Sequence, residues 1–225
     1  MRPGDDGGQQ AHDGRVSPRE QPRRPTFLGP RAMDSLEAPG DAAGREAAAH
    51  ATARLLVEGA QSSGDAEVAA RLVGLADEHG LELLAQLWAD AAPESLPGAL
   101  WRLYVLRQWV HGAPSEASRQ FDEGRRRAPV LEAVAGVADP PGPDEVRTQV
   151  DAVLAGVATG DFAGTLERAA AFARVVAVGR ADLADDEASG DGADEDALTT
   201  SAGRLVRTAE HLEACAGRWR SGSLL

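Results

Sequence analysis

The stretch Ser-Leu-Pro-Gly-Ala-Leu-Trp-Arg-Leu-Tyr-Val-Leu-Arg-Gln-Trp-Val, residues 95–110, decides the fold class of this chain. When each residue is stepped by about 100° around a helix, apolar side chains cover nearly the whole circumference. A helix that is apolar on all sides belongs in the middle of a protein. The stretch therefore predicts a central buried helix with other helices packed around it.

The aromatic and charged side chains of this helix set its possible roles. The aromatic centre of the core is expected to consist of Trp88, Trp101, Tyr104 and Trp109. Arg102 falls beside Trp109 on the helical wheel, where an unpaired charge is costly. We expect it to pair with an internal carboxylate, to reach solvent or to stack on an indole; in the alternative, it clamps an anionic ligand.

Helical spacing of apolar residues continues on both sides of this stretch, without sustained period-two alternation of β-branched residues. Proline, glycine and aspartate mark the boundaries. The chain is predicted to be all-α, with a single helical-bundle-like domain of seven to nine helices at 41–220. The expected helices cover 41–59, 65–79, 81–91, 96–110, 115–127, 129–137, 144–157, a stretch beginning at 161, and a last one from about 199–201.

Residues 1–40 contain six of the 13 prolines, six arginines and few apolar residues. Such a segment buries too little surface to offset its ordering entropy, so a disordered tail is predicted. Met33 opens a more ordinary acidic sequence and is an alternative start of translation.

The charge and the scarce residue types exclude several functions. The chain has 23 basic and 36 acidic residues, a formal charge of −13, and one cysteine. Every basic residue is arginine, which excludes a P-loop lysine and a lysine Schiff base. One cysteine excludes a disulfide framework and a cysteine-based metal site. We therefore predict no catalytic residues, no metal and no cofactor, and no direct binding of nucleic acid.

Two charged segments are candidate interaction surfaces. Residues 182–196 hold eight of the acidic residues and no basic one, which predicts a flexible acidic loop between two helices. An arginine cluster ends an earlier helix and complements its dipole, or it docks the acidic loop or another acidic surface. The residues predicted to contact an unidentified protein partner are Arg125, Arg126, Arg127, Asp185, Asp186 and Asp194.

The last helix carries a seven-residue pattern of large residues and alanines: Leu198, Ala202, Leu205, Ala209, Leu212, Ala216 and Trp219. Small residues in such a seam let another helix approach closely. Its partner is an internal helix or, in a homodimer, a second copy. His211 and Cys215 share one face, but a thiolate–imidazole pair needs a third, orienting group, so Cys215 is expected to be a small buried residue.

No stretch approaches the roughly 20 apolar residues of a transmembrane helix, and the N-terminus lacks the apolar run of a signal peptide. We therefore expect a cytoplasmic protein without membrane contact.

Four segments carry a resemblance: Leu96-Pro97-Gly98-Ala99-Leu100-Trp101-Arg102-Leu103-Tyr104, Ala128-Pro129-Val130, Ala138-Asp139-Pro140-Pro141-Gly142-Pro143 and Thr159-Gly160-Asp161-Phe162. With them the chain resembles, over about residues 65–180, a family of uncharacterised proteins from high-GC actinobacteria. Some members carry the label RNA polymerase beta subunit, which is not literal because a catalytic beta subunit is several times longer. The resemblance implies an actinobacterial origin and a helical fold, and it brings no catalytic residues.

These observations favour a non-catalytic protein-interaction or regulatory module. An alternative is an enzyme or a binder of small anions, with a pocket near Trp101, Arg102, Tyr104 and Arg107. A further alternative is a factor that associates with RNA polymerase.

Overall fold

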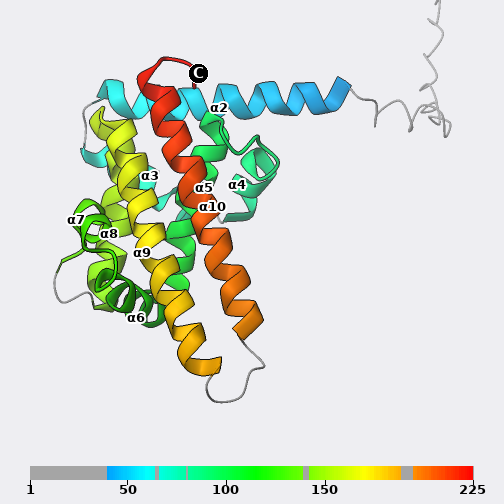
Figure 1. Cartoon of the computed structure of the whole chain (residues 1–225). Coiled ribbons are helices and arrows are strands. Elements are labelled where there is room, and N and C mark those ends of the chain that lie inside the picture. Colours follow the sequence, from blue (N-terminus) through cyan, green and yellow to red (C-terminus); the bar gives the residue numbers. More distant parts are fainter. Residues whose placement is uncertain (1–39, 64–65, 80, 139–141, 189–194, 225) are drawn as a thin grey trace, which may run out of the picture. The chain divides into compact units, whose positions relative to one another are not determined.

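The computed structural model describes residues 40–63, 66–79, 81–138, 142–188 and 195–224. Every regular element in these ranges is a helix (Figure 1). The α-helices are α2 (Gly40–Ser63), α3 (Ala66–His79), α4 (Leu81–Trp88), α5 (Leu96–Gly112), α6 (Pro114–Arg125), α7 (Pro129–Ala135), α8 (Pro143–Ala155), α9 (Phe162–Ala188) and α10 (Glu195–Arg220), and Gly156–Thr159 forms a 3-10 helix. The predicted all-α fold of seven to nine helices is confirmed for the described chain.

The chain divides into a unit at residues 1–38 and a unit at residues 39–225, and the following description concerns the second. The predicted tail at 1–40 lies outside the described residues apart from Gly40. None of the described helices is long and apolar enough to cross a membrane.

Helix boundaries follow the local signals that the sequence carries. The Ser95 hydroxyl accepts a hydrogen bond from the Gly98 amide, and Pro97 occupies the first turn of α5. At the C-terminal end of α7, Gly136 has a φ of 72°, a conformation that glycine adopts without strain.

The prediction of an acidic loop over residues 182–196 is wrong at both ends of that range. α9 continues to Ala188 and α10 already begins at Glu195, so both ends of that segment are helical. Aspartate and glutamate do not break a helix, and Ala184 is fully buried, so α9 still packs against the core there. Residues 189–194 lie outside the described chain.

α9 and α10 lie side by side as the yellow and orange helices of Figure 1. The seam residues Ala202, Ala209, Leu212 and Ala216 are buried, and Trp219 meets Phe162 edge-on with ring centroids 4.8 Å apart. The side chain of Leu198 is not among those described. Because α9 covers this seam within the same chain, a homodimer through it would require α9 to move away.

α6 crosses α9 at two glycines. A Cβ on Gly124 would overlap the carbonyl oxygen of Val175, and one on Gly179 would overlap that of Gln120. The two backbones therefore touch directly, with no room for a side chain between them. This contact holds Gln120 next to the last third of α9.

The composition of α5 predicted a helix buried on every side. The helix is central, but part of its surface is exposed. Trp88 and Tyr104 are buried, with ring centroids 6.2 Å apart, and form two of the four members of the predicted aromatic centre. Trp101 and Trp109 are only half-buried, and Val105 between them is 39% exposed. One face of α5 is therefore open, and the candidate site lies along it.

Candidate ligand-binding site

The four residues predicted to share a pocket fall into two separate groups. Tyr104 is fully buried, and its hydroxyl donates a 2.7 Å hydrogen bond to the carbonyl oxygen of Leu72 in α3. Burial raises the pKa of this phenol. Arg107 is also buried. The predicted pocket is therefore wrong for Tyr104 and Arg107, since both are buried and neither lines the cavity that Trp101 and Arg102 line.

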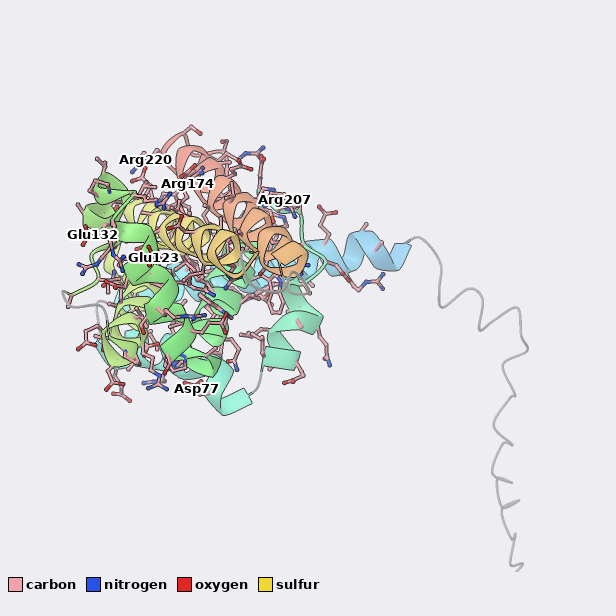
Figure 2. The ribbon with its side chains drawn as sticks, turned by 60° about the horizontal axis from the view of Figure 1, so that its bottom comes forward. Asp77, Glu123, Glu132, Arg174, Arg207 and Arg220 are labelled. Atoms are coloured by element: carbon pink, nitrogen blue, oxygen red, sulfur yellow. The ribbon has the colours of Figure 1, made fainter. Side chains whose placement is uncertain are left out.

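The Arg107 guanidinium donates hydrogen bonds to two carboxylates from other helices. Its two terminal nitrogens bond Asp77 at 2.9 and 2.8 Å, and its Nε bonds Asp151 at 2.6 Å. His111 Nε2 lies 2.9 Å from the same Asp151 oxygen. These bonds join α3, α5 and α8. Figure 2 labels Asp77, which lies at the edge of the helical unit. Arg107 is thus a structural cross-link.

Trp101 and Arg102 line a cavity of about 480 Å³ between α5 and α10. α5 contributes residues at helical spacing on its open face, α10 contributes the facing residues, and α9 contributes one arginine. The lining residues are Trp101, Arg102, Val105, Leu106, Trp109, Arg180, Ser201, Arg204, Leu205 and Thr208. The walls thus combine two indoles and aliphatic side chains with three guanidinium groups.

α5 and α10 run in opposite directions along this cavity. Near the start of α5, the Cys215 thiol of α10 approaches the carbonyl oxygens of Pro93 and Ser95 at 3.8 and 3.9 Å. Near its end, Trp109 lies beneath Arg180, which in turn bonds Ser201 of α10. The cavity therefore has one end at Trp101 and Arg102 and another at Trp109 and Arg180.

Arg180 is the most deeply placed cation of the site. It is 6% exposed, and its carbon Cζ lies 4.9 Å from the centroid of the Trp109 ring. Nε and Nη2 donate to Gln120 Oε1 at 3.0 and 2.9 Å, and Nη1 donates to the Ser201 hydroxyl. All these acceptors are neutral. Burial lowers the pKa of the guanidinium, and the charge of the nearby Glu116 carboxylate, which accepts a bond from Gln120 Nε2, partly opposes this. Three of its five N–H donors are used, which leaves two.

Arg102 and Arg204 complete the cationic lining. Arg102 is half-buried, donates one bond of 2.8 Å to the carbonyl oxygen of Gly98, and has its pKa lowered by burial. Arg204 is exposed on α10. Within the described part of the chain, no carboxylate lies within 4 Å of Arg102, Arg180 or Arg204. The predicted pairing of Arg102 with an internal carboxylate is not found.

Sequence reasoning missed all the polar residues that α9 and α10 contribute to the site: Arg180, Ser201, Arg204 and Thr208. One signal for Arg180 was present, because it continues the buried stripe of α9 that includes Phe162, Leu166, Ala173 and Val176. A charged residue at the end of such a stripe must find polar partners inside the protein. The α10 residues carried no comparable signal.

The arginine cluster at the end of α6 is mostly paired locally. Arg125 and Arg126 both bond Asp122, at 2.8 and 3.2 Å. Arg127 bonds Asp182 at 2.7 Å, so one member does meet the acidic segment, within α9. The side chains of Asp185 and Asp186 are not described, and Asp194 lies outside the described residues.

Cys215 is a buried packing residue, as predicted. Burial is the main cause that raises the pKa of its thiol, to about 11. A thiol that keeps its proton at neutral pH is a poor nucleophile. Over the described helices, no group of three or more His, Cys, Asp or Glu side chains is placed to hold a metal ion.

The comparisons with known proteins leave the geometry as the basis for a function. No family model, curated protein or solved structure matches this chain.

Proposed function

We propose that this protein binds a small organic anion with an apolar part in the cavity between α5 and α10. One observation carries the proposal. Seven of the described arginines are buried or half-buried, and five of them have a carboxylate within 4 Å: Arg107, Arg125, Arg147, Arg168 and Arg174. The other two are Arg102 and Arg180, and both line this cavity.

The energetics favour a negatively charged ligand here. Removing a guanidinium from water is costly unless an opposite charge or enough acceptors replace the water. Gln120 and Ser201 supply neutral acceptors to Arg180, and the carbonyl oxygen of Gly98 supplies one to Arg102. An anion that enters the cavity adds charge-assisted hydrogen bonds, which are about twice as strong as neutral ones.

The rest of the lining favours a ligand with an apolar or aromatic part. Trp101 and Trp109 offer indole surface, and Val105 and Leu205 lie between the two ends. The cavity volume of about 480 Å³ is in the range of small-molecule sites, about 300–1,000 Å³. A simple inorganic anion would leave these apolar walls in contact with water.

The proposal can be tested with the anionic aromatic dye anilinonaphthalenesulfonate and the purified full-length chain. We expect the dye to bind the native protein at one site, with quenching of tryptophan fluorescence. Arg204→Ala should weaken binding about three- to tenfold, the equivalent of one exposed charge-assisted contact. Arg102→Gln should weaken it about tenfold or more.

Arg207→Ala is the matched control. Arg207 is also an exposed arginine of α10, one turn from Arg204 and labelled in Figure 2, but it does not line the cavity. It should leave dye affinity unchanged. Near-ultraviolet circular dichroism should show that every variant keeps native packing. Equal dye binding by native-like wild type, Arg102→Gln and Arg204→Ala proteins would overturn the proposal.

A second candidate function is the protein-interaction module that the sequence favoured. The observation behind it is the outer face of α7, where Val130 is 76% and Val134 45% exposed. Changing both to serine should abolish capture of a partner from native lysate, whereas Leu55→Ser, at an equally exposed site on α2, should not. Capture unaffected by the α7 changes would remove this candidate.

We propose a cytoplasmic location, and we keep association with RNA polymerase as the third candidate function. Co-purification with tagged polymerase, compared between wild type and the α7 variant, tests the latter.

A further inference from the structure

We propose that the ligand of the α5–α10 cavity is a nucleoside phosphate, that is, a flat aromatic base joined to one or more phosphate groups. This inference rests on the proposed function and adds the chemical class of the anion. Three features of the cavity carry it: its excess of positive charge, its length, and the stacking of Arg180 on Trp109 at its more buried end.

The first feature is the number of cations. Arg102, Arg180 and Arg204 line one cavity, and none of them has a carboxylate within 4 Å among the described residues. Glu116 acts on Arg180 only from a longer distance, behind Gln120. A monocarboxylate would neutralise one of the three. A phosphate monoester carries close to two negative charges near pH 7 and has three terminal oxygens, and a diphosphate carries more. Phosphate oxygens also match the planar donor fork of arginine.

The second feature is the length of the site. Arg102 and Trp109 are seven residues apart on α5, which places them about 10 Å apart along the helix axis. Arg180 lies over Trp109, so Arg102 and Arg180 mark opposite ends of the cavity. A nucleotide has a comparable length between its base and its terminal phosphate. A compact anion would reach only one end.

The third feature decides which end takes which part of the ligand. At the deep end, the Arg180 guanidinium already stacks on Trp109 and also lines the cavity. A flat base can lie against the guanidinium and continue this stack, since cations and aromatic rings attract each other face to face. With two N–H donors left, Arg180 can also bond the edge of a base.

The phosphate then lies toward Arg102. Arg204 stands on α10 between Ser201 and Thr208 and lines the cavity between its two ends, next to the phosphate. Arg102 uses one of its five donors, on Gly98, and is half-buried, whereas Arg180 is 6% exposed. This end keeps contact with water, which suits a group that is strongly hydrated. Thr208 lines the same cavity and supplies a hydroxyl donor. The two ends thus differ in burial in the way that the two parts of a nucleotide differ in hydration.

Isothermal titration calorimetry of the full chain tests the inference with five probes: adenosine diphosphate, guanosine diphosphate, adenosine, inorganic pyrophosphate and naphthalene carboxylate. We expect at least one of the two nucleotides to bind about tenfold or more tightly than the other three probes, because only a nucleotide fills both ends. Arg204→Ala should weaken nucleotide and pyrophosphate binding but not that of adenosine. Arg207→Ala should change none of them.

The outcomes separate this inference from the proposed function. If naphthalene carboxylate binds as tightly as the nucleotides, and Arg204→Ala weakens its binding, the cavity takes organic anions and the nucleotide assignment is wrong. If pyrophosphate alone binds as tightly as the nucleotides, the base contributes nothing and the assignment is also wrong. If no probe binds and the dye does not bind either, both proposals fail.

Discussion

Replacing Gly179 with alanine should destabilise the protein, although alanine is the better helix former. The residue lies where α9 crosses α6. An added Cβ would overlap the carbonyl oxygen of Gln120 and lie 2.6 Å from the amide nitrogen of Gly124, closer than the 3.0 Å at which real Cβ contacts begin. Both neighbours are backbone atoms, which cannot rotate away, so α6 must move as a whole.

The expected loss of stability follows from two opposing effects. Overpacking of this kind costs about 1–3 kcal/mol, and the change from glycine to alanine inside a helix returns about 0.5–1 kcal/mol. Because the overlap involves backbone on α6, we take the upper part of the first range. The net loss is then about 2 kcal/mol, which for a chain of this size lowers Tm by about 4–8 °C.

Urea unfolding followed by circular dichroism measures this difference, with Gly217→Ala as the control. A Cβ on Gly217 of α10 would meet nothing within 4 Å, so this variant should be as stable as wild type or more stable by up to about 1 kcal/mol. If Gly179→Ala unfolds at the same urea concentration as Gly217→Ala, the two helices are not in backbone contact and the reasoning fails.

Three other perturbations test the fold and its electrostatics. Hydrogen bonds from Arg107 hold the pKa of Asp77 below its ordinary value; the resulting stabilisation is present above the unfolded-state pKa of about 3.9 and is lost as the pH falls through the lower folded-state pKa. Asp77→Asn should therefore make the urea midpoint fall less steeply below about pH 4 than in wild type, and identical pH profiles would contradict this. Cys215, buried and with its pKa raised to about 11, should resist a disulfide reagent at pH 8 until urea unfolds the chain; modification within minutes in native buffer would show that the thiol is accessible. Ser95→Ala removes the cap of α5 and should cost about 1 kcal/mol, read as a lower Tm, whereas an unchanged Tm would show that the cap contributes little.

Most of the fold could be predicted because its signals are local. Pro97, Gly80 and Asp161 mark helix boundaries from the residues next to them, and the helices begin or end nearby. The acidic segment was predicted poorly for the same reason. Its composition is typical of a loop, but the burial of Ala184, a tertiary contact, keeps the end of α9 helical.

The candidate site could be predicted only on α5. A helical wheel places Arg102 about 140° from Arg107 and about 160° from Tyr104, so the sequence already contained the reason why these residues do not share a face. Arg180 and Arg204 could not be assigned to the site. Their place depends on which helices pack against α5, and apolar periodicity gives the face of a helix but not its neighbour.

The bonds of Arg180 have a consequence for how an occupied cavity would be detected. The same guanidinium that would contact a ligand also joins Gln120 of α6 to Ser201 of α10. A ligand that immobilises Arg180 would therefore slow the opening of the first turns of α10, even though that helix is mostly held by α9. Amide protons near Ser201 should then exchange with solvent more slowly, which makes binding visible in the backbone at the start of α10.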